Sequence, residues 1–197
     1  MEKVIDIRPI KKQLRADCKQ SRKDMNSAEK ETYDKKIKNK LLNLFVLRDS
    51  QTVLTYVSTD IEVDTRGLLE ELFNSKKTVA VPKCENKDGD MAFYIIKSFD
   101  DLESGYCGVL EPIPQKCEIL TEFENSVCIV PAFLFDKKGY RLGYGKGYYD
   151  RFLAKYTGIT VGICYDNNIT DSLFHGKYDR TVNMIVTDKR IIDNRLF

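Results

Sequence analysis

The run SVCIVPAFLF, at residues 126–135, is the most continuous apolar segment of this 197-residue chain. An apolar run without alternating polar residues is typical of a central strand that is buried on both faces of a parallel sheet. Upstream of it, the β-rich runs TVLTYV (52–57) and TVAVP (78–82) flank RGLLEELFNS (66–75), which favours a helix. Strand, helix and strand in this order indicate a parallel crossover, so the sequence predicts an α/β protein.

The same criteria predict further elements on either side of these runs. MAFYII (91–96), GITVGICY (158–165) and VNMIVT (182–187) are expected to be strands, the last of them the final strand of the chain. GYYDRFLAKY (147–156) is expected to be a helix, and the polar region 97–126, which contains several Gly and Pro residues, to be mainly loop.

Two helices are predicted at the start of the chain. Pro9 suits the first turn of a helix that continues to about residue 24. Asn26 followed by Glu29 resembles a capping pair, and the second helix has an apolar face made of Tyr33, Ile37, Leu41, Leu44 and Phe45. The whole chain, 1–197, is therefore predicted to be a single three-layer α/β domain with a mostly parallel central sheet, helices on both faces and an N-terminal helical pair.

The composition, 42% hydrophobic and 31% charged residues, is that of a soluble globular domain and outside the range of disordered chains. The charged first residues and the lack of a long apolar run predict neither a secretory signal nor a membrane span. No CxxC pair or histidine cluster indicates a zinc site, since His175 is the only histidine. Reduced thiols in a cytoplasmic protein are expected for the six cysteines, Cys18, Cys84, Cys107, Cys117, Cys128 and Cys164.

Charge is unevenly distributed along the chain. The net charge is +2, but residues 1–48 carry +7 and the rest −5. Lys11, Arg15, Lys19 and Arg22 fall on one stripe of the first predicted helix. The moderate total charge and the lack of a nucleic-acid motif favour a small phosphate ligand over nucleic acid, while a solvated helix face remains the alternative.

Chemistry-bearing residues are concentrated in FDKKGYRLGYGKGYYDRFL, at 135–153. Alternating glycines at 143, 145 and 147 let backbone N–H groups approach an anion at a helix start, and Lys146 adds a positive charge. Asp150, one turn further, could give a carboxylate to Mg²⁺. The segment lacks GxxxxGK[ST], and Tyr148 stands where GxGxxG requires its last glycine. A tight strand-to-helix connection is the plain structural alternative.

The full string RLGYGKGYYDRFL (141–153) resembles the signature of the 5-formyltetrahydrofolate cyclo-ligase family. KKQLR (11–15) is similar to the family's basic helix, and YVSTDIEVDT (56–65) to its substrate loop. VPK, SGYCGVLEP and TVNMIVT extend the resemblance over nearly the whole chain. Two departures stand out: Ala132-Phe133 replace the usual Gly-Leu, and Asn183 replaces an aspartate that the family assigns to the metal, where an amide oxygen would coordinate Mg²⁺ more weakly.

The resemblance implies a ligase that forms a C–N bond, converting 5-formyltetrahydrofolate to 5,10-methenyltetrahydrofolate with ATP and Mg²⁺ and releasing ADP and phosphate. ATP phosphorylates the formyl oxygen, and N10 then attacks the activated carbon. The implied catalytic residues are Lys146, Arg141 and Tyr148. The implied ATP-binding residues are Lys11, Lys12, Gln13, Leu14, Arg15, Arg141, Leu142, Gly143, Tyr144, Gly145, Lys146, Gly147, Tyr148 and Tyr149. The implied folate-binding residues are Val57, Glu62, Tyr144, Gly145, Lys146, Gly147 and Tyr148, and the implied metal ligands are Asp150 and Asn183.

Two other classes of function remain open on the residues alone. One is an enzyme such as a sugar-phosphate isomerase or acyl transferase, whose glycine loop would hold phosphate without consuming ATP. The other is a non-catalytic protein that binds nucleic acid or folate through the basic helix. His175 has no partner for a nucleophilic triad and is expected to be a bystander. No nucleic-acid or membrane partner is predicted, and the chain is expected to be a monomer or weak dimer.

Overall fold

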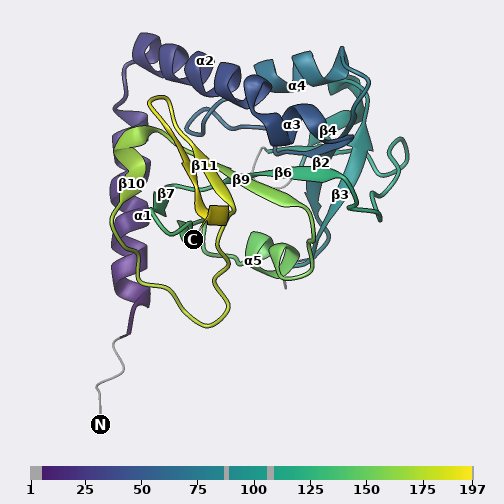
Figure 1. Cartoon of the computed structure of the whole chain (residues 1–197). Helices are drawn as coiled ribbons and strands as arrows, with labels where there is room; N and C mark the ends of the chain where they lie inside the picture. The colour runs from purple at the N-terminus through teal and green to yellow at the C-terminus, as the bar shows by residue number, and fades with distance from the viewer. Residues whose placement is uncertain (1–5, 87–88, 106–108, 197) are drawn as a thin grey trace.

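The computed structural model describes residues 6–86, 89–105 and 109–196, and its elements form three layers (Figure 1). The helices are α1 (Arg8–Lys23), α2 (Ser27–Asn43), α3 (Phe45–Asp49), α4 (Arg66–Phe73) and α5 (Tyr148–Leu153), with 3-10 turns η1 (Phe99–Asp101), η3 (Asp166–Asn168) and η4 (Asn194–Leu196). Cys107 and the middle of SGYCGVLEP lie outside the described residues.

A seven-stranded sheet forms the middle layer of the described chain. Its order is β12 (Ile191–Asp193), β11 (Met184–Val186), β9 (Ile159–Ile163), β6 (Ser126–Pro131), β1 (Thr52–Leu54), β2 (Thr78–Cys84) and β3 (Met91–Ile96). The five strands from β11 to β2 are parallel, and only the edge strands β12 and β3 are antiparallel to their neighbours. The predicted α/β class with a mostly parallel sheet is confirmed.

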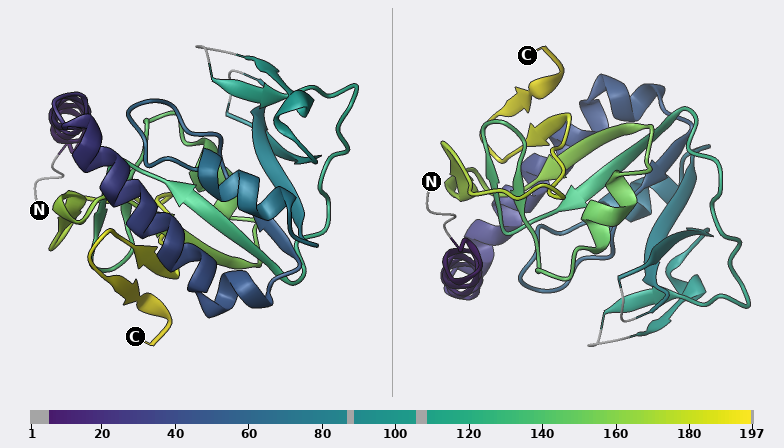
Figure 2. Two further views of the ribbon diagram at one scale, coloured as in Figure 1. Left: turned by 90° about the horizontal axis from the view of Figure 1, so that it is seen from above. Right: turned by 90° about the horizontal axis from the view of Figure 1, so that it is seen from below.

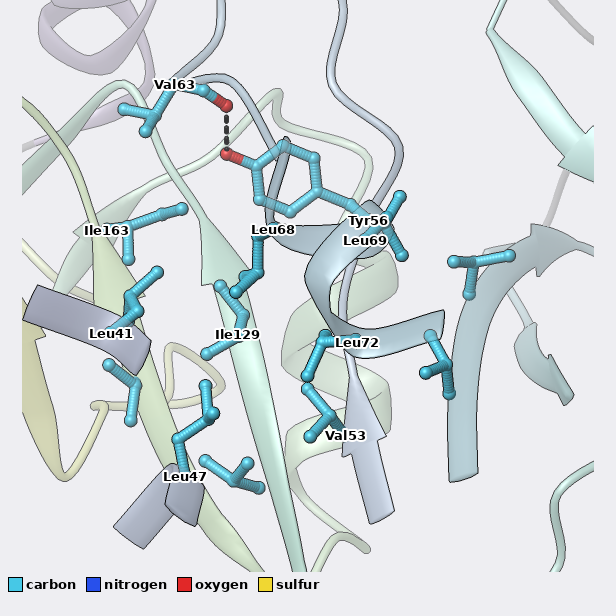
Figure 3. Packing of buried hydrophobic residues seen from close by; sticks show 14 of the residues in the cluster. Leu41, Leu47, Val53, Tyr56, Val63, Leu68, Leu69, Leu72, Ile129 and Ile163 are labelled. Atoms are coloured by element: carbon cyan, nitrogen blue, oxygen red, sulfur yellow. Dashed lines mark hydrogen bonds between the residues drawn. The ribbon is translucent and has the colours of Figure 1, made fainter. Parts of the chain in front are cut away.

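Successive side chains of the central strands point to opposite faces of the sheet and pack in two separate hydrophobic cores. Val53 and Ile129 pack with α2, α3 and α4 on one face, whereas Leu54 and Val130 pack with α5 on the other. Figure 2 shows α2–α4 over the sheet from above and α5 beneath it from below, and Figure 3 shows the first core, where leucines of the helices meet the strands. Burying each such side chain contributes about 1.5–3 kcal/mol, which explains why these strands lack alternating polar residues.

Some predicted boundaries are wrong. The run at 126–135 is not one strand: β6 ends at Pro131, and β7 (Leu134–Asp136) belongs to a small sheet with β8 (Arg141–Leu142) and β10 (Ile169–Thr170). Residues 97–126 contain the hairpin β4 (Leu102–Ser104) and β5 (Leu110–Pro112) as well as loop. VNMIVT is not the final strand, since β12 follows and pairs with it. The second helix ends at Asn43, and Phe45, in α3, is 74% exposed rather than part of a buried face.

The predicted cap of α2 is formed by Asn26 alone. The Asn26 side chain accepts hydrogen bonds from the backbone N–H groups of Ala28 (2.9 Å) and Glu29 (3.4 Å). The Glu29 carboxylate accepts instead from the hydroxyl of Tyr33 at 2.5 Å, one turn along the helix. One side chain therefore satisfies the first free N–H groups of α2.

Replacing Asn26 with alanine is expected to lower the free energy of unfolding by about 1 kcal/mol, because the N–H groups of the first turn lose their acceptor. The unfolding temperature should fall by about 2–4 °C for a chain of this size. Asn26→Gly is the matched control, since glycine at this position costs only about a few tenths of a kcal/mol. Equal losses in both variants, measured by calorimetry, would contradict the capping role.

Candidate functional site

The candidate site lies at the carboxyl edge of the parallel sheet, where the connections diverge. From β1 the chain continues to β2 on one side, whereas β6, β9 and β11 lie on the other. The loop after β1 (residues 55–65) and the connection after β6 (residues 132–147, which include β7 and β8) therefore leave the same edge on either side of a topological switch point. Ligands of open α/β sheets bind in the crevice that such a divergence creates.

A hydrogen bond between Glu62 and Tyr144 joins these two loops. The Tyr144 hydroxyl donates to Glu62 Oε1 at 2.7 Å, and Glu62 Oε2 accepts from the N–H and hydroxyl of Thr59 at 2.8 and 2.9 Å. Glu62 is 7% exposed, whereas Tyr144 is half-exposed. Burial, and then the charge and hydrogen bond of Glu62, raise the pKa of Tyr144, so its hydroxyl remains a donor. The contact brings together two residues predicted for folate.

A buried arginine supports this junction from behind. Arg22 is 5% exposed, and its guanidinium donates to the carbonyls of Ala132 (2.6 Å), Phe133 (3.0 Å) and Ile61 (3.4 Å). It also lies 5.2 Å from the ring centroid of Phe133, whose ring contacts that of Tyr144. The sequence places Arg22 on the cationic stripe of the first helix, but the structure turns it inward, where it fastens the loop of Glu62 to the loop after β6.

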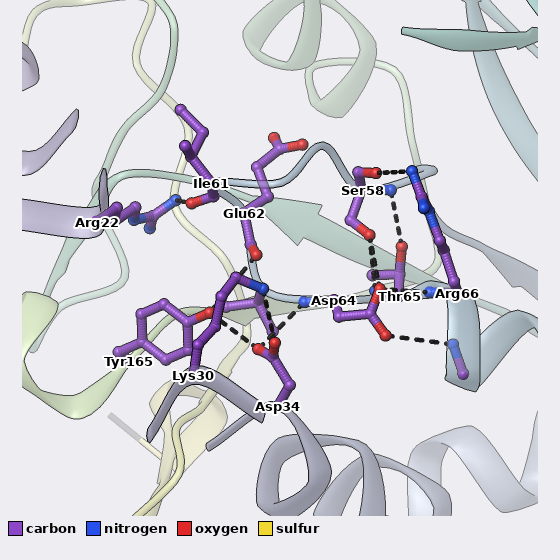
Figure 4. A network of polar contacts seen from close by, with 12 residues as sticks. Arg22, Lys30, Asp34, Ser58, Ile61, Glu62, Asp64, Thr65, Arg66 and Tyr165 are labelled. Atoms are coloured by element: carbon purple, nitrogen blue, oxygen red, sulfur yellow. Dashed lines mark hydrogen bonds and ion pairs between the residues drawn. The ribbon is translucent and has the colours of Figure 1, made fainter. Parts of the chain in front are cut away.

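A polar network holds the other end of the Glu62 loop against α2 (Figure 4). The buried carboxylate of Asp34 accepts hydrogen bonds from the Tyr165 hydroxyl (2.9 Å), the Asp64 N–H (3.2 Å) and the Lys30 ammonium (2.7 Å). These bonds come from α2, from the loop and from Tyr165, so Asp34 holds the loop against α2. Asp34 and Arg22 carry no motif that would reveal these supporting roles in the sequence.

The glycine loop, residues 143–147 between β8 and α5, is fixed by backbone geometry and two arginines. Gly145 and Gly147 have φ values of +92° and +74°, which side chains other than glycine rarely adopt. Arg15 Nε donates to the carbonyl of Gly143 at 2.8 Å, and Arg151 donates to that of Lys146 at 2.7 Å. The Lys146 side chain is exposed, so the loop presents a cation on a fixed backbone.

An ion pair between Arg141 and Asp150 joins β8 to the start of α5. Arg141 is 7% exposed and donates to Asp150 Oδ1 at 2.9 Å, and the backbone N–H of Arg180 donates to the same oxygen at 3.2 Å. Burial lowers the pKa of Arg141, although a guanidinium keeps its proton at neutral pH. Four buried side-chain polar atoms of the described residues lack a hydrogen-bond partner: Arg141 Nε, the Tyr149 hydroxyl, Arg22 Nε and the Thr55 hydroxyl. Such groups can be satisfied by a bound polar ligand.

Only some of the N-terminal residues predicted to bind ATP phosphates lie near the glycine loop. Lys11 and Arg15 lie on one side of α1: the Lys11 ammonium contacts the carboxylate of Asp179 at 2.5 Å, and Arg15 bonds the glycine loop. Leu14 packs against the small apolar cluster beneath the loop. Lys12 is exposed, and Gln13 donates to Asp17 of the same helix at 2.8 Å. The structure therefore brings Lys11 and Arg15, but not Gln13, to the glycine loop and its neighbour at 176–180.

Replacing Lys11 with methionine is expected to lower the free energy of unfolding by about 0.5–1 kcal/mol at neutral pH. Burial alone would raise the pKa of Asp179, but hydrogen bonds from Lys11 and from the Gly176 N–H lower it overall, below its ordinary value of 3.8. Because the pKa of Asp179 is lower in the folded chain than in the unfolded chain, the ion pair stabilises the fold at pH values above the unfolded pKa. This stabilisation is lost as the pH falls through the folded pKa.

The difference between Lys11→Met and wild type should therefore disappear at the acid end of a stability curve measured by urea unfolding. Lys12→Met is the control, because Lys12 is exposed on the same helix. A difference that persists below the folded pKa of Asp179 would contradict the ion-pair account.

The two predicted metal ligands differ in their surroundings. Asp150 faces the cleft beside the glycine loop, and both of its hydrogen bonds go to Oδ1. The Asn183 carboxamide oxygen accepts from the N–H and the hydroxyl of Thr160, at 2.8 and 2.9 Å, at the amino end of β9. No cluster of three or more His, Cys, Asp or Glu side chains that could hold a metal occurs in the described parts of the chain.

The remaining predicted site residues lie on or under the two loops. Val57 is 5% exposed and packs in the core, so its side chain does not face the crevice. Leu142 is buried beneath the loop. The Tyr148 hydroxyl donates to the carbonyl of Asn86 at 2.9 Å, which joins the start of α5 to the residues just after β2.

A model of the 5-formyltetrahydrofolate cyclo-ligase family matches residues 7–188. The chain belongs to this family. It is 30% identical over 147 residues to the probable 5-formyltetrahydrofolate cyclo-ligase of Schizosaccharomyces pombe, and the match covers 68% of this chain and 72% of that one. It is 26% identical over 167 residues to the Haemophilus influenzae enzyme, covering 83% and 89%. The NMR structure of Aquifex aeolicus 5,10-methenyltetrahydrofolate synthetase superposes with a TM-score of 0.84 at 30% identity, covering 94% and 93%.

Membership of the 5-formyltetrahydrofolate cyclo-ligase family confirms the predicted family and enzyme class, a cyclo-ligase acting on a folate. The cysteines within the described residues are free thiols, as expected. Burial raises the pKa of Cys128 and Cys164, which fits core thiols rather than nucleophiles. His175 stacks on Tyr140 with ring centroids 3.7 Å apart. None of the helices in the described parts of the chain has the length and hydropathy that a membrane span requires.

Proposed function

We propose that the chain converts 5-formyltetrahydrofolate to 5,10-methenyltetrahydrofolate with ATP and Mg²⁺, releasing ADP and phosphate. The observation that carries the proposal is the junction of Glu62 and Tyr144, which places a buried carboxylate beside the cationic glycine loop. A carboxylate can accept hydrogen bonds from the donor-rich edge of a pterin, while the loop and its arginines suit phosphate. Family membership supports the folate substrate and ATP.

The reaction requires the formyl oxygen to leave, and this oxygen is a poor leaving group. Transfer of the γ-phosphoryl group from ATP to that oxygen, with ADP departing, creates a phosphate ester as a better leaving group. N10 then attacks the formyl carbon and loses its proton to solvent, a C–N bond forms, and the oxygen departs within inorganic phosphate. Such a sequence needs positioning and charge stabilisation rather than a strong protein base, consistent with a chain whose single histidine stacks on a tyrosine.

The chain's own residues divide this work between two ends of the crevice. Glu62 would hold the pterin, and Tyr144 would orient Glu62 or exchange its hydrogen bond for one to the folate. Lys146 would neutralise the transferring phosphoryl group, while Arg15 would contact the phosphates from α1. Arg141 would hold Asp150 in position for a metal, through the ion pair that already joins them.

Asp150 is the one protein metal ligand in this proposal, because Asn183 would have to give up two hydrogen bonds from Thr160. One carboxylate fits Mg²⁺, which typically binds through one or two carboxylates together with phosphate oxygens and water. When bound, Mg²⁺ would supply charge neutralisation at the transferring phosphoryl group. We also propose that the protein is a cytoplasmic monomer or weak dimer without nucleic-acid or membrane partners. The free thiols support a cytoplasmic location, because disulfides are rare there.

The test is an omission experiment with purified protein. Methenyl product, followed by its absorbance, should form only when 5-formyltetrahydrofolate, ATP and Mg²⁺ are all present. Product without nucleotide would contradict the proposal and would favour an enzyme that holds phosphate without consuming ATP. Binding of folate or nucleic acid with no product under any condition would favour a non-catalytic protein.

A further inference from the structure

A cleft of about 520 Å³ opens between the glycine loop, the start of α5 and the segment 176–180. This volume is in the usual range for small-molecule sites. The cleft is lined by Arg15, Gly145, Gly147, Asp150, Arg151, Ala154, Tyr178, Asp179 and Arg180. The segment 176–180 enters it from the far end of the sequence, and none of its residues carries a phosphate-binding motif.

The cleft has an excess of positive charge that its own carboxylates do not neutralise. Asp150 and Asp179 are already paired with cations outside the lining, Arg141 at 2.9 Å and Lys11 at 2.5 Å. The arginines of the lining therefore have no carboxylate of their own among the described residues. A second hollow of about 460 Å³, between α2 and residues 58–67, differs in that its basic side chains are matched by an equal number of carboxylates.

The arginines of the cleft differ in how they are used. Arg151 donates to the carbonyls of Gly89 (2.9 Å) and Lys146 (2.7 Å), so it fastens the glycine loop. Arg15 uses one of its N–H groups, Nε, to bond the carbonyl of Gly143. The backbone of Arg180 is held by the hydrogen bond from its N–H to Asp150. Its guanidinium is exposed and makes no hydrogen bond or ion pair with any described residue.

Tyr178 is the second unusual member of the segment 176–180. Its ring is 77% exposed although it lines the cleft, and the Lys177 ammonium lies 5.9 Å from its centroid. An aromatic side chain that is left in solvent at the rim of a cationic cleft offers a stacking surface for a planar ligand group.

We propose that the segment 176–180 is the second wall of the nucleotide site, with Arg180 binding a phosphate of a nucleoside triphosphate and Tyr178 stacking on its base. This inference rests on the proposed use of ATP and extends it to residues outside the glycine loop and α1. A guanidinium suits the role because it can donate two parallel hydrogen bonds to one phosphate.

Binding of a non-hydrolysable ATP analogue and of inorganic triphosphate, measured by calorimetry, separates the two roles. Arg180→Ala should weaken both probes about ten-fold or more, because both contain the phosphates. Tyr178→Ala should weaken the ATP analogue about five- to thirty-fold and leave inorganic triphosphate unchanged, because only the analogue has a base to stack. Phe174→Ala, which removes another exposed aromatic of the same stretch that does not line the cleft, should bind both probes as wild type does.

The inference is overturned if the wild type binds the ATP analogue and both Arg180→Ala and Tyr178→Ala, shown to be folded by thermal unfolding, bind it equally well. Equal weakening of both probes in Tyr178→Ala would overturn the assignment of the base to Tyr178. Absence of any nucleotide binding by the wild type, together with product formation without ATP, would instead contradict the proposed function itself. 5-Formyltetrahydrofolate should bind all variants with unchanged affinity.

Discussion

Replacing Lys146 with alanine is expected to lower turnover about 10²- to 10³-fold while the fold survives, a loss of about 3–4 kcal/mol of transition-state stabilisation. The Lys146 side chain is exposed between two glycines, and the loop is held through the Lys146 carbonyl by Arg151 rather than through the ammonium. The variant therefore removes little packing, and it removes the cation that we propose neutralises the developing phosphoryl charge. The unfolding free energy should stay within about 0.5 kcal/mol of wild type.

Lys155→Ala is the matched control for Lys146→Ala. Lys155 is also exposed, but it stands two residues after the end of α5 and outside the glycine loop. Its loss should leave the rate constant of turnover unchanged. If Lys146→Ala turns over at the wild-type rate, the glycine loop is only a strand-to-helix connection and the proposed phosphoryl site is wrong.

Replacing Glu62 with glutamine is expected to weaken binding of 5-formyltetrahydrofolate about ten- to hundred-fold, because hydrogen bonds to a charged acceptor are worth about 1.5–3 kcal/mol. Glutamine keeps the size of the side chain and one carbonyl acceptor. The amide group of glutamine, however, cannot accept hydrogen bonds from both Thr59 and a pterin donor as the carboxylate can. The substitution is therefore also expected to disturb the loop.

Affinity for a non-hydrolysable ATP analogue should be unchanged in Glu62→Gln, since Glu62 is not among the residues that line the cationic cleft. Asp60→Asn is the control, because it neutralises an exposed carboxylate of the same loop. Equal losses of folate and nucleotide affinity in Glu62→Gln would indicate general damage to the loops. An unchanged folate affinity would contradict the role of Glu62.

The fold could be predicted from the sequence where burial is strong and continuous. The central strands β1, β2, β6 and β9 are buried on both faces, so their apolar runs carry the signal. The same signal cannot separate β6 from β7, because both are wholly buried although they belong to different sheets. The hairpin strand β4 is mostly exposed and only three residues long, and so it has no apolar pattern to detect.

The candidate site could be located from the sequence but not built from it. The glycine loop and Glu62 are local features, and their contact through Tyr144 depends on the divergence of the strands at the switch point. Helical spacing places Arg22 with Lys11 and Arg15, yet cannot tell which cation turns inward to bind carbonyls. Arg180 and Tyr178 are brought to the cleft by tertiary structure alone, since they stand about thirty residues beyond the loop in a stretch without regular structure.

Isotope transfer would show whether the formyl oxygen leaves as part of phosphate. The protein should be given 5-formyltetrahydrofolate labelled with ¹⁸O at the formyl group, together with ATP and Mg²⁺, and the released phosphate analysed by mass spectrometry. We expect one ¹⁸O atom in each phosphate and a matching amount of methenyl product. Unlabelled phosphate, with the ¹⁸O recovered in water while product forms, would contradict it.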